Sequence, residues 1–164
     1  RMDKTDKRIL AVLKEDARTT HETLATMLSL EVGDVSTRIE RMERDGVIAK
    51  YTTVVNNELV QSDDFVIALI EVKVTPQMTH GFDSIAREIM QCEQVSSVYL
   101  MSGSYDLSVI VEGRNLKEVS SFVSARLSVM ENVISTATHF ILKKYKSEGV
   151  VLDRGADKKR QELV

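Results

Sequence analysis

Apolar residues in the first third of the chain recur at the spacing of one face of a helix, and they do so three times. The pattern predicts a helix over residues 3–16, a short helix opened by a capping box at Thr19–Glu22, and a third helix that ends at Asp45, just before the helix-stopping Gly46. A run rich in β-branched residues, Val47–Val55, then predicts a strand. Three short helices separated by tight turns are typical of a helix-turn-helix DNA-binding domain.

Beyond residue 55 the pattern changes to strands that alternate with helices, after a polar linker at 55–64. The predicted order is strand Phe65–Thr75, helix Thr79–Gln91, strand Val95–Met101, strand Tyr105–Glu112, helix Leu116–Met130 and strand Val133–Tyr145. This βαββαβ order is that of a ferredoxin-like domain. The predicted fold class is therefore α+β, with a helix-turn-helix domain at 2–54, a ferredoxin-like domain at 65–146 and a charged tail at 147–164.

One face of such a sheet lies under the two helices, and the other face is open. The alternation along the strands leaves a mostly apolar set on the open face, with two possibilities for the last strand: Ile67, Leu69, Ile110 and either Thr136, Thr138 and Phe140 or Ala137, His139 and Ile141. A face this apolar is unfavourable in water. The sequence therefore predicts that copies of the chain associate through the sheet.

Composition narrows the classes of function. The 164-residue chain is 43% hydrophobic and 29% charged, and its one cysteine, Cys92, leaves no internal disulfide framework. Three scattered histidines provide no metal-binding cluster. No apolar stretch approaches the roughly 18–20 residues that span a bilayer, and no nucleophile, base and orienting group occur together. We expect a cytoplasmic protein that is not an enzyme and has no cofactor, metal or membrane partner.

The outward face of the third helix carries residue types that bind DNA. Arginine can pair with guanine through two hydrogen bonds, and serine or threonine hydroxyls can reach base edges or phosphates. The candidate DNA-binding residues on and beside this face are Ser36, Thr37, Arg38, Arg41 and Arg44. From periodicity alone, the same face could equally be the solvated charged surface of an ordinary three-helix bundle.

Two blocks of residues, together with the order of the elements, resemble the Lrp/AsnC family of leucine-responsive or feast/famine transcription regulators. The first block comprises Asp6-Lys-Arg-Ile-Leu10, Glu15-Asp-Ala-Arg18, Leu24-Ala25, Val35-x-x-Arg38-Ile-x-Arg-Met42, Asp45-Gly-Val-Ile48 and Tyr51. The second block is Gly103-Ser-Tyr-Asp106, between two strands of the βαββαβ unit. The resemblance extends over essentially the whole chain to about residue 146.

The resemblance implies an amino-terminal helix-turn-helix, a linker strand, and a carboxy-terminal domain that dimerises and binds small effectors, usually amino acids. Dimers in the family commonly assemble into octamers, with effector sites where dimers meet. Carried over to this chain, the effector-binding residues are those of one loop and two threonines of the last strand: Met101, Ser102, Gly103, Ser104, Tyr105, Asp106, Thr136 and Thr138.

The loop has two interpretations. As an effector site, Gly103 lets backbone N–H groups approach a carboxylate, Asp106 provides negative charge for an ammonium group, and Met101 favours a small or medium apolar side chain. As a plain turn, Gly103 only permits the hairpin and Asp106 caps its N–H groups.

Two positions before the third helix depart from the family pattern. The family usually has glycine where Ser29 stands, because a helix end often needs φ > 0, and serine as the helix cap where Glu31 stands. Between Glu31 and Asp45, three arginines face five acidic residues, so one chain should bind DNA weakly and depend on dimer or octamer avidity.

The predicted function is a sequence-specific regulator of transcription that binds double-stranded DNA and is modulated by a small effector, an amino acid. The predicted assembly is a homodimer that forms octamers. The alternative is an amino-acid sensor of the same fold in which DNA binding is weak or lost.

Overall fold

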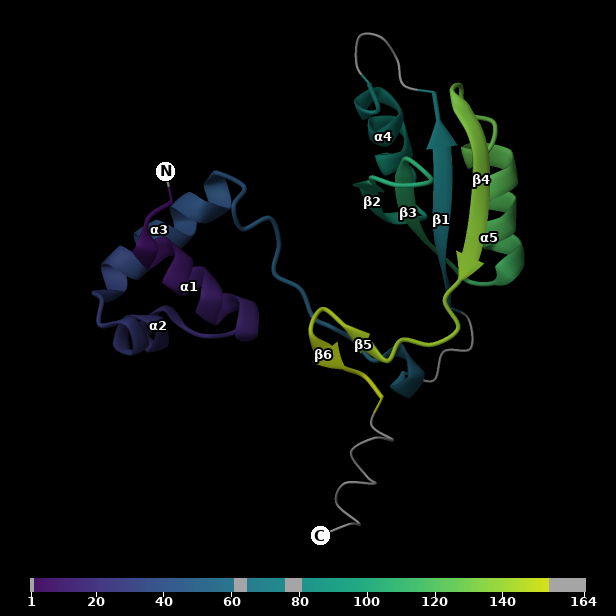
Figure 1. Ribbon diagram of the computed structural model, residues 1–164. Helices are drawn as coiled ribbons and strands as arrows, with labels where there is room; N and C mark the ends of the chain where they lie inside the picture. Colours follow the sequence, from purple (N-terminus) through teal and green to yellow (C-terminus); the bar gives the residue numbers. More distant parts are fainter. Residues whose placement is uncertain (1, 61–64, 76–80, 154–164) are drawn as a thin grey trace. The chain divides into compact units, whose positions relative to one another are not determined.

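The computed structural model describes residues 2–60, 65–75 and 81–153 (Figure 1). The chain divides into two compact units, residues 1–55 and 56–164. Each unit has its own cluster of buried apolar side chains, so each is organised around a separate core.

Three helices form the first unit: α1 (Lys4–Glu15), α2 (His21–Leu28) and α3 (Val32–Arg44). Their apolar faces meet in a core built around Ile9, Leu24 and Val35, whose side chains are fully buried. Asp3 begins α1 with a reciprocal cap, because its carboxylate accepts a hydrogen bond from the Asp6 backbone N–H and its own N–H donates to the Asp6 carboxylate. The three helices predicted from periodicity are confirmed.

The start of α2 differs from the predicted capping box by one residue. Thr20, and not Thr19, is the N-cap, and its hydroxyl oxygen accepts a hydrogen bond from the Thr23 backbone N–H at 3.2 Å. Glu22 lies in the first turn, where its negative charge favours the helix N-terminus.

The turn between α2 and α3 places Ser29 in the left-handed region, with φ 56° and ψ 53°. The backbone N–H of Leu30 closes this turn by donating to the Ala25 carbonyl oxygen at 2.9 Å. A residue with a side chain is strained in this conformation, which explains why the family pattern has glycine there. Glu31 begins α3 without a side-chain capping hydrogen bond, as expected for glutamate at an N-cap.

The predicted strand at Val47–Val55 is wrong. These residues form turns and irregular backbone, and none of the strands in the described part of the chain pairs with them. A β-branched run favours extended backbone, but a strand exists only when another strand accepts and donates its hydrogen bonds. Val54 and Val55 remain exposed.

The second unit is a four-stranded antiparallel sheet with its main helices packed on one face (Figure 1). The strand order is β2-β3-β1-β4. The elements, in chain order, are η1 (Asn57–Leu59), β1 (Val66–Val74), α4 (Asp83–Met90), β2 (Val95–Leu100), β3 (Leu107–Gly113), α5 (Leu116–Phe122), η2 (Val123–Leu127), β4 (Val133–Phe140), β5 (Lys146–Ser147) and β6 (Val150–Val151). The predicted βαββαβ order is confirmed.

Several predicted boundaries shift. The helix predicted from Thr79 begins at Asp83, and Thr79 lies outside the described residues. Tyr105 precedes β3, and β4 ends at Phe140, well before Tyr145. The helix predicted over 116–130 is α5 followed by a π-helical turn, η2, in which the Ser128 N–H donates to the Val123 carbonyl oxygen at 2.8 Å. Leu116 begins that helix and is 56% exposed.

The strand register decides between the two sets proposed for the open face. Thr136, Thr138 and Phe140 pair with the buried residues Val72, Ile70 and Ala68, so they share the helix-covered face. The open face therefore carries the other set, together with residues of β1 and β3: Ala137, His139, Ile141, Ile67, Leu69 and Ile110.

The beginning of the second unit contacts its last described residues. The side-chain amide of Asn56 donates a hydrogen bond to the Leu152 carbonyl oxygen at 2.7 Å. The hairpin of β5 and β6 lies beside this point, and the Leu152 side chain is buried. This hydrogen bond thus joins the first residue of the unit to the end of its described part.

Candidate functional site

The outer face of α3 presents a mixed set of polar side chains. Val35, Ile39 and Met42 point into the core, which leaves Thr37 and Arg44 exposed on the opposite side. The Arg44 side chain is 72% exposed and lies 3.9 Å from the Asp45 carboxylate. The Thr37 hydroxyl donates to the Gly33 carbonyl oxygen at 2.9 Å, within the same helix.

Ser36 is turned toward the other helix of the motif. Its hydroxyl is hydrogen-bonded to Nδ1 of His21 at 2.7 Å. Both side chains are half-buried. Ser36 therefore links the start of α2 to α3, in addition to its predicted role in DNA binding.

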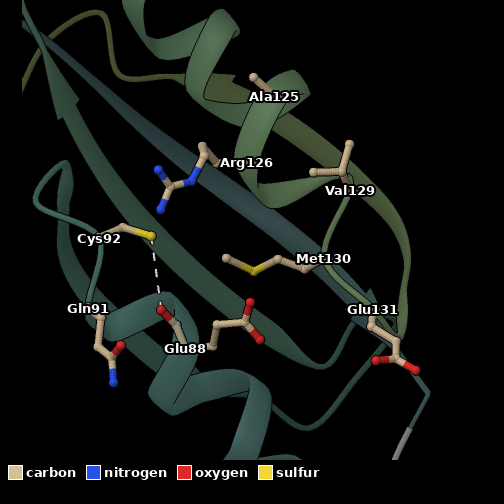
Figure 2. A pocket seen from close by; sticks show the side chains of 8 residues that line it. All are labelled: Glu88, Gln91, Cys92, Ala125, Arg126, Val129, Met130 and Glu131. Carbon is tan, nitrogen blue, oxygen red and sulfur yellow. Dashed lines mark hydrogen bonds between the residues drawn. The ribbon is translucent and has the colours of Figure 1, made fainter.

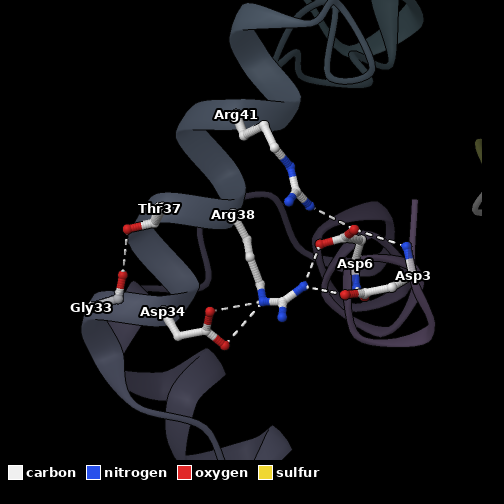
Figure 3. A network of polar contacts seen from close by, with 7 residues as sticks. All are labelled: Asp3, Asp6, Gly33, Asp34, Thr37, Arg38 and Arg41. Carbon is white, nitrogen blue, oxygen red and sulfur yellow. Dashed lines mark hydrogen bonds and ion pairs between the residues drawn. The ribbon is translucent and has the colours of Figure 1, made fainter. Parts of the chain in front are cut away.

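Arg38 is held by three carboxylates (Figure 3). Its Nε donates to both Asp34 oxygens at 3.0 and 2.9 Å, and its Nη1 donates to Asp3 at 2.7 Å and to Asp6 at 2.8 Å. The Arg38 side chain is 20% exposed. Arg38 thus binds the N-terminus of α1 to the middle of α3.

Asp6 is the centre of this network. Its side chain is 1% exposed, and its second oxygen accepts a hydrogen bond from Arg41 Nη2 at 2.7 Å. Two arginines and a backbone N–H therefore compensate one buried carboxylate. The sequence pattern could not show this, because Asp6 lies 32 and 35 residues before its arginine partners.

The network shifts the ionisation of its members. The hydrogen bond from Arg38 is the main cause that lowers the pKa of Asp3 to about 2, and the same contact raises the pKa of Arg38. Burial is the largest influence on Asp6 and raises its pKa, but hydrogen bonds from the Asp3 backbone and Arg38 outweigh it and leave the pKa lowered. Asp3 and Asp6 are therefore charged at neutral pH.

The predicted DNA-binding residues thus fall into two groups. Arg44 and Thr37 lie on the exposed side of α3, and Arg41 is partly exposed at 40%. Arg38 and Ser36 are engaged within the fold. Contact of any of these residues with DNA stays a prediction.

The loop between β2 and β3 is closed by Asp106. Its carboxylate accepts a hydrogen bond from the Val74 backbone N–H at 2.9 Å, its N–H donates to the Val72 carbonyl oxygen at 3.1 Å, and its carbonyl oxygen accepts from the Met101 N–H at 2.8 Å. Gly103 has φ 148°, a conformation that favours glycine. Asp106 therefore joins the loop to the end of β1, where the register with β4 shifts.

Thr136 and Thr138 lie at the same end of the sheet as this loop but on its helix-covered face. Thr136 pairs with Val72, which also pairs with Leu107 at the start of β3. Its hydroxyl is hydrogen-bonded to the Ser128 hydroxyl at 3.2 Å. Two strand spacings, roughly 10 Å, separate Thr136 from the loop, so one chain does not bring all the predicted effector residues into contact.

A groove that the sequence did not predict lies on the helix-covered side of the second unit, with a volume of about 540 Å³ (Figure 2). Its lining residues come from the end of α4 and from the segment around η2: Glu88, Gln91, Cys92, Ala125, Arg126, Val129, Met130 and Glu131. No short motif marks these positions, because the groove depends on how two helices pack.

Two classes of site find no support in the described residues. No group of three or more histidine, cysteine, aspartate or glutamate side chains there is placed to hold a metal ion. No helix in the same part of the chain has the length and apolar character to cross a membrane.

Family models match both units. The Lrp/AsnC ligand binding domain matches residues 67–151, and a winged helix-turn-helix DNA-binding model matches residues 2–49. Among curated relatives, the uncharacterized HTH-type transcriptional regulator YugG of Bacillus subtilis (strain 168) is 45% identical over 152 residues, which cover 93% of this chain and 92% of YugG. An uncharacterized HTH-type transcriptional regulator of Pyrococcus horikoshii is 33% identical over 147 residues, covering 90% and 95% of the two chains.

Solved structures share the fold. The leucine response regulatory protein LrpA of Mycobacterium tuberculosis is 25% identical with a TM-score of 0.74, and the match covers 93% of this chain and 100% of that one. A transcriptional regulator of Neisseria meningitidis, crystallised as a complex with L-Met, is 24% identical with a TM-score of 0.69 and coverage of 90% and 94%. The family models over both units and the 45% identity to YugG together show that this chain belongs to the Lrp/AsnC family, as a transcriptional regulator with a DNA-binding helix-turn-helix unit and a ligand-binding unit.

Proposed function

We propose that the protein is a sequence-specific regulator whose DNA binding or assembly is controlled by a free amino acid. The observation that carries this proposal is the outer face of α3, where Thr37 and Arg44 are exposed on a helix that the Asp6 network holds against α1. A helix-turn-helix protein reads the major groove with side chains on such a face.

In this proposal Arg44 and Arg41 make the contacts with DNA, and Arg38 mainly orients α3. Arg44 is largely exposed, and Arg41 shares only one of its nitrogens with Asp6. Arg38 donates from both Nε and Nη1 to carboxylates of the same unit. A DNA phosphate would have to compete with three acidic groups for it, which is unfavourable.

The effector part of the proposal places an amino acid at the loop of residues 101–106. Gly103 has no side chain and open space beside its Cα, so a carboxylate can approach the backbone there, and one Asp106 oxygen already holds β1 through Val74. A ligand at this loop would act directly on the end of β1. The Neisseria meningitidis regulator was crystallised with L-Met, which makes methionine a reasonable first probe.

The assembly part of the proposal is a dimer through the open face of the sheet, with octamers built from dimers. Leu69 and Ile110 pair across β1 and β3 on that face and are only half-buried in one chain. Contact with a second copy would remove them from water.

A second candidate function follows from the charges around α3. Arg38 is neutralised inside the unit, and from Glu31 to Asp45 five acidic residues accompany three arginines. This arrangement favours an amino-acid sensor with weak DNA binding, the alternative that the sequence also allows.

The experiment that separates the two candidates measures fluorescence anisotropy on DNA from upstream of the protein's own gene and on a scrambled duplex. The parent, Arg44→Ala and Arg41→Ala are compared, with Arg114→Ala as the control, because Arg114 is exposed in the other unit. We expect each α3 variant to weaken binding to the upstream DNA by about 5-fold or more, while the control binds like the parent. Equal, weak binding of the parent to both duplexes would reject regulation through DNA and support the sensor.

A further inference from the structure

The groove between α4 and η2 has an uneven distribution of charge. Arg126 enters it from η2, Glu88 from the end of α4, and Glu131 from the turn before β4. Figure 2 shows the Arg126 guanidinium and the Glu88 carboxylate pointing into the space between the helices, with the Met130 side chain between them. One cation and one anion therefore face one space of ligand size, and Glu131 adds a second anion at its edge.

These charges do not neutralise one another. Among the residues that the structure describes, Arg38, Arg41, Arg44 and Arg114 each form an ion pair, whereas none of the ion pairs includes Arg126, Glu88 or Glu131. The Glu88 backbone carbonyl accepts a contact from Cys92 Sγ, but its carboxylate makes none of the hydrogen bonds found there. The groove thus holds opposite charges on either side of the flexible Met130 side chain, and no ion pair found in the described part of the chain uses them.

Apart from the polar amide of Gln91, the rest of the lining is apolar or only weakly polar. Cys92 is 8% exposed and packs at the edge of the core, and Met130 is partly buried against the same core. Ala125 and Val129 complete this side. Methionine adapts its shape to a neighbouring apolar group.

We propose that this groove binds a free α-amino acid with an apolar side chain, as a site separate from the 101–106 loop. Arg126 binds the carboxylate, Glu88 and Glu131 bind the ammonium group, and Met130 with Val129 contacts the side chain. A polyanion such as a nucleotide would meet two carboxylates, and a metal cation would meet the guanidinium. A zwitterion is the class of small ligand that matches both signs of charge.

The test titrates the full-length protein with L-leucine and L-methionine by calorimetry. Arg126→Gln and Glu88→Gln remove one charge each from the groove, and Arg87→Gln is the matched control, because Arg87 is exposed on the same helix but does not line the groove. We expect Arg126→Gln to weaken binding at one site per chain by at least about tenfold, since a charge-assisted hydrogen bond is lost. Arg87→Gln should match the parent.

Edited ligands identify which charge each residue binds. Leucinol lacks the carboxylate, and N-acetyl-leucine lacks the ammonium group. Leucinol should bind the parent weakly, and Arg126→Gln should not weaken its binding further. N-acetyl-leucine should likewise bind the parent weakly, and Glu88→Gln should not weaken its binding further. If the altered ligand and the substitution each reduced the affinity and the two reductions added, the assigned contacts would be contradicted.

A local signal places the ligand. Methyl-labelled methionine reports on Met130 by NMR, with Met130→Leu used to assign its signal among the seven methionines. L-leucine should shift the Met130 methyl signal in the parent and in Asp106→Asn, but not in Arg126→Gln. The proposal is overturned if neither amino acid binds the parent, or if Arg126→Gln binds and shifts like the parent. Loss of binding in Asp106→Asn alone would support the loop site and reject the groove.

Discussion

Single residues in the first unit that are predicted to contact DNA also hold the fold together, which sequence patterns do not reveal. Arg38 and Arg41 lie three positions apart on α3, and both reach Asp6. Periodicity places both near the outer face of the helix, because it records direction around one helix and not the partners on another. The contacts with α1 give Arg38 a role in holding the fold together, which a family motif alone could not specify.

Replacement of Arg38 should therefore lower the stability of the fold, apart from any effect on DNA binding. In Arg38→Ala, Asp6 keeps Arg41 but loses one charged partner while it stays buried, so we expect the free energy of unfolding to fall by about 1–3 kcal/mol. Arg44→Ala removes an exposed side chain and should change it by less than about 0.5 kcal/mol. Urea unfolding followed by circular dichroism measures both. Equal stability of Arg38→Ala and the parent would show that the network contributes little.

The left-handed conformation of Ser29 makes a second prediction at this scale. Ser29→Gly should raise the free energy of unfolding by roughly 0.5–1 kcal/mol, because relief of backbone strain exceeds the added entropy of the unfolded chain. Gly46→Ala is the opposite change. Gly46 has φ 72°, and the space that an added Cβ would occupy is open, so strain alone should lower stability. Thermal unfolding of the two variants should move in opposite directions.

Replacement of Asp106 by asparagine removes the charge of the side chain and keeps its shape. Asparagine can still accept the hydrogen bond from the Val74 N–H through its side-chain oxygen. Asp106→Asn should therefore keep the thermal stability of the parent, and it should weaken the binding of an amino acid at the loop by at least ~1.5 kcal/mol. Calorimetry with L-methionine measures the affinity. Unchanged affinity at every site would mean that the loop is only a turn.

At the scale of elements, periodicity predicted the features that depend on residues close in sequence. It missed the features that depend on contacts between distant segments. The three helices and the order of strands followed from apolar spacing within each segment. The run at Val47–Val55 has strand composition but no partner strand in the described chain. The π-helical turn at η2 and the groove beside it depend on the packing of helices against the sheet, for which spacing along the chain carries no information.

The ion pairs that join α1 to α3 should weaken at low pH. The pKa of Asp3 is lowered from its ordinary value of 3.8 to about 2, and that of Asp6 is lowered as well. Groups with a depressed pKa stabilise the folded state above pH 3.8, and this contribution is lost as the pH falls toward about 2. The free energy of unfolding should therefore decrease between about pH 4 and pH 2. In Asp3→Asn, the free energy of unfolding should decrease less over this range. If it fell with pH as steeply as in the parent, the contribution assigned to Asp3 would be contradicted.

At the scale of the whole molecule, the open face of the sheet predicts association. Register, and not composition, settled which β4 residues share that face with Leu69 and Ile110. In the dimer that we propose, Leu69→Asp should leave a monomer, because a carboxylate buried at the interface without a partner costs several kcal/mol. Light scattering at micromolar concentration measures the mass. Ser120→Asp, exposed on α5, is the control and should remain associated; a monomeric parent would exclude the interface.

The hydrogen bond from Asn56 to Leu152 has a consequence for protein engineering. It brings the first residue of the second unit next to the last residues that the structure describes. A unit that begins at Asn56 and is cut after Asp153 has neighbouring ends, and it can be circularly permuted, or inserted into a host protein, through short connectors without stretching its sheet. The ligand-binding unit of this protein is thus a suitable module for a biosensor of its ligand, with new termini opened elsewhere on its surface.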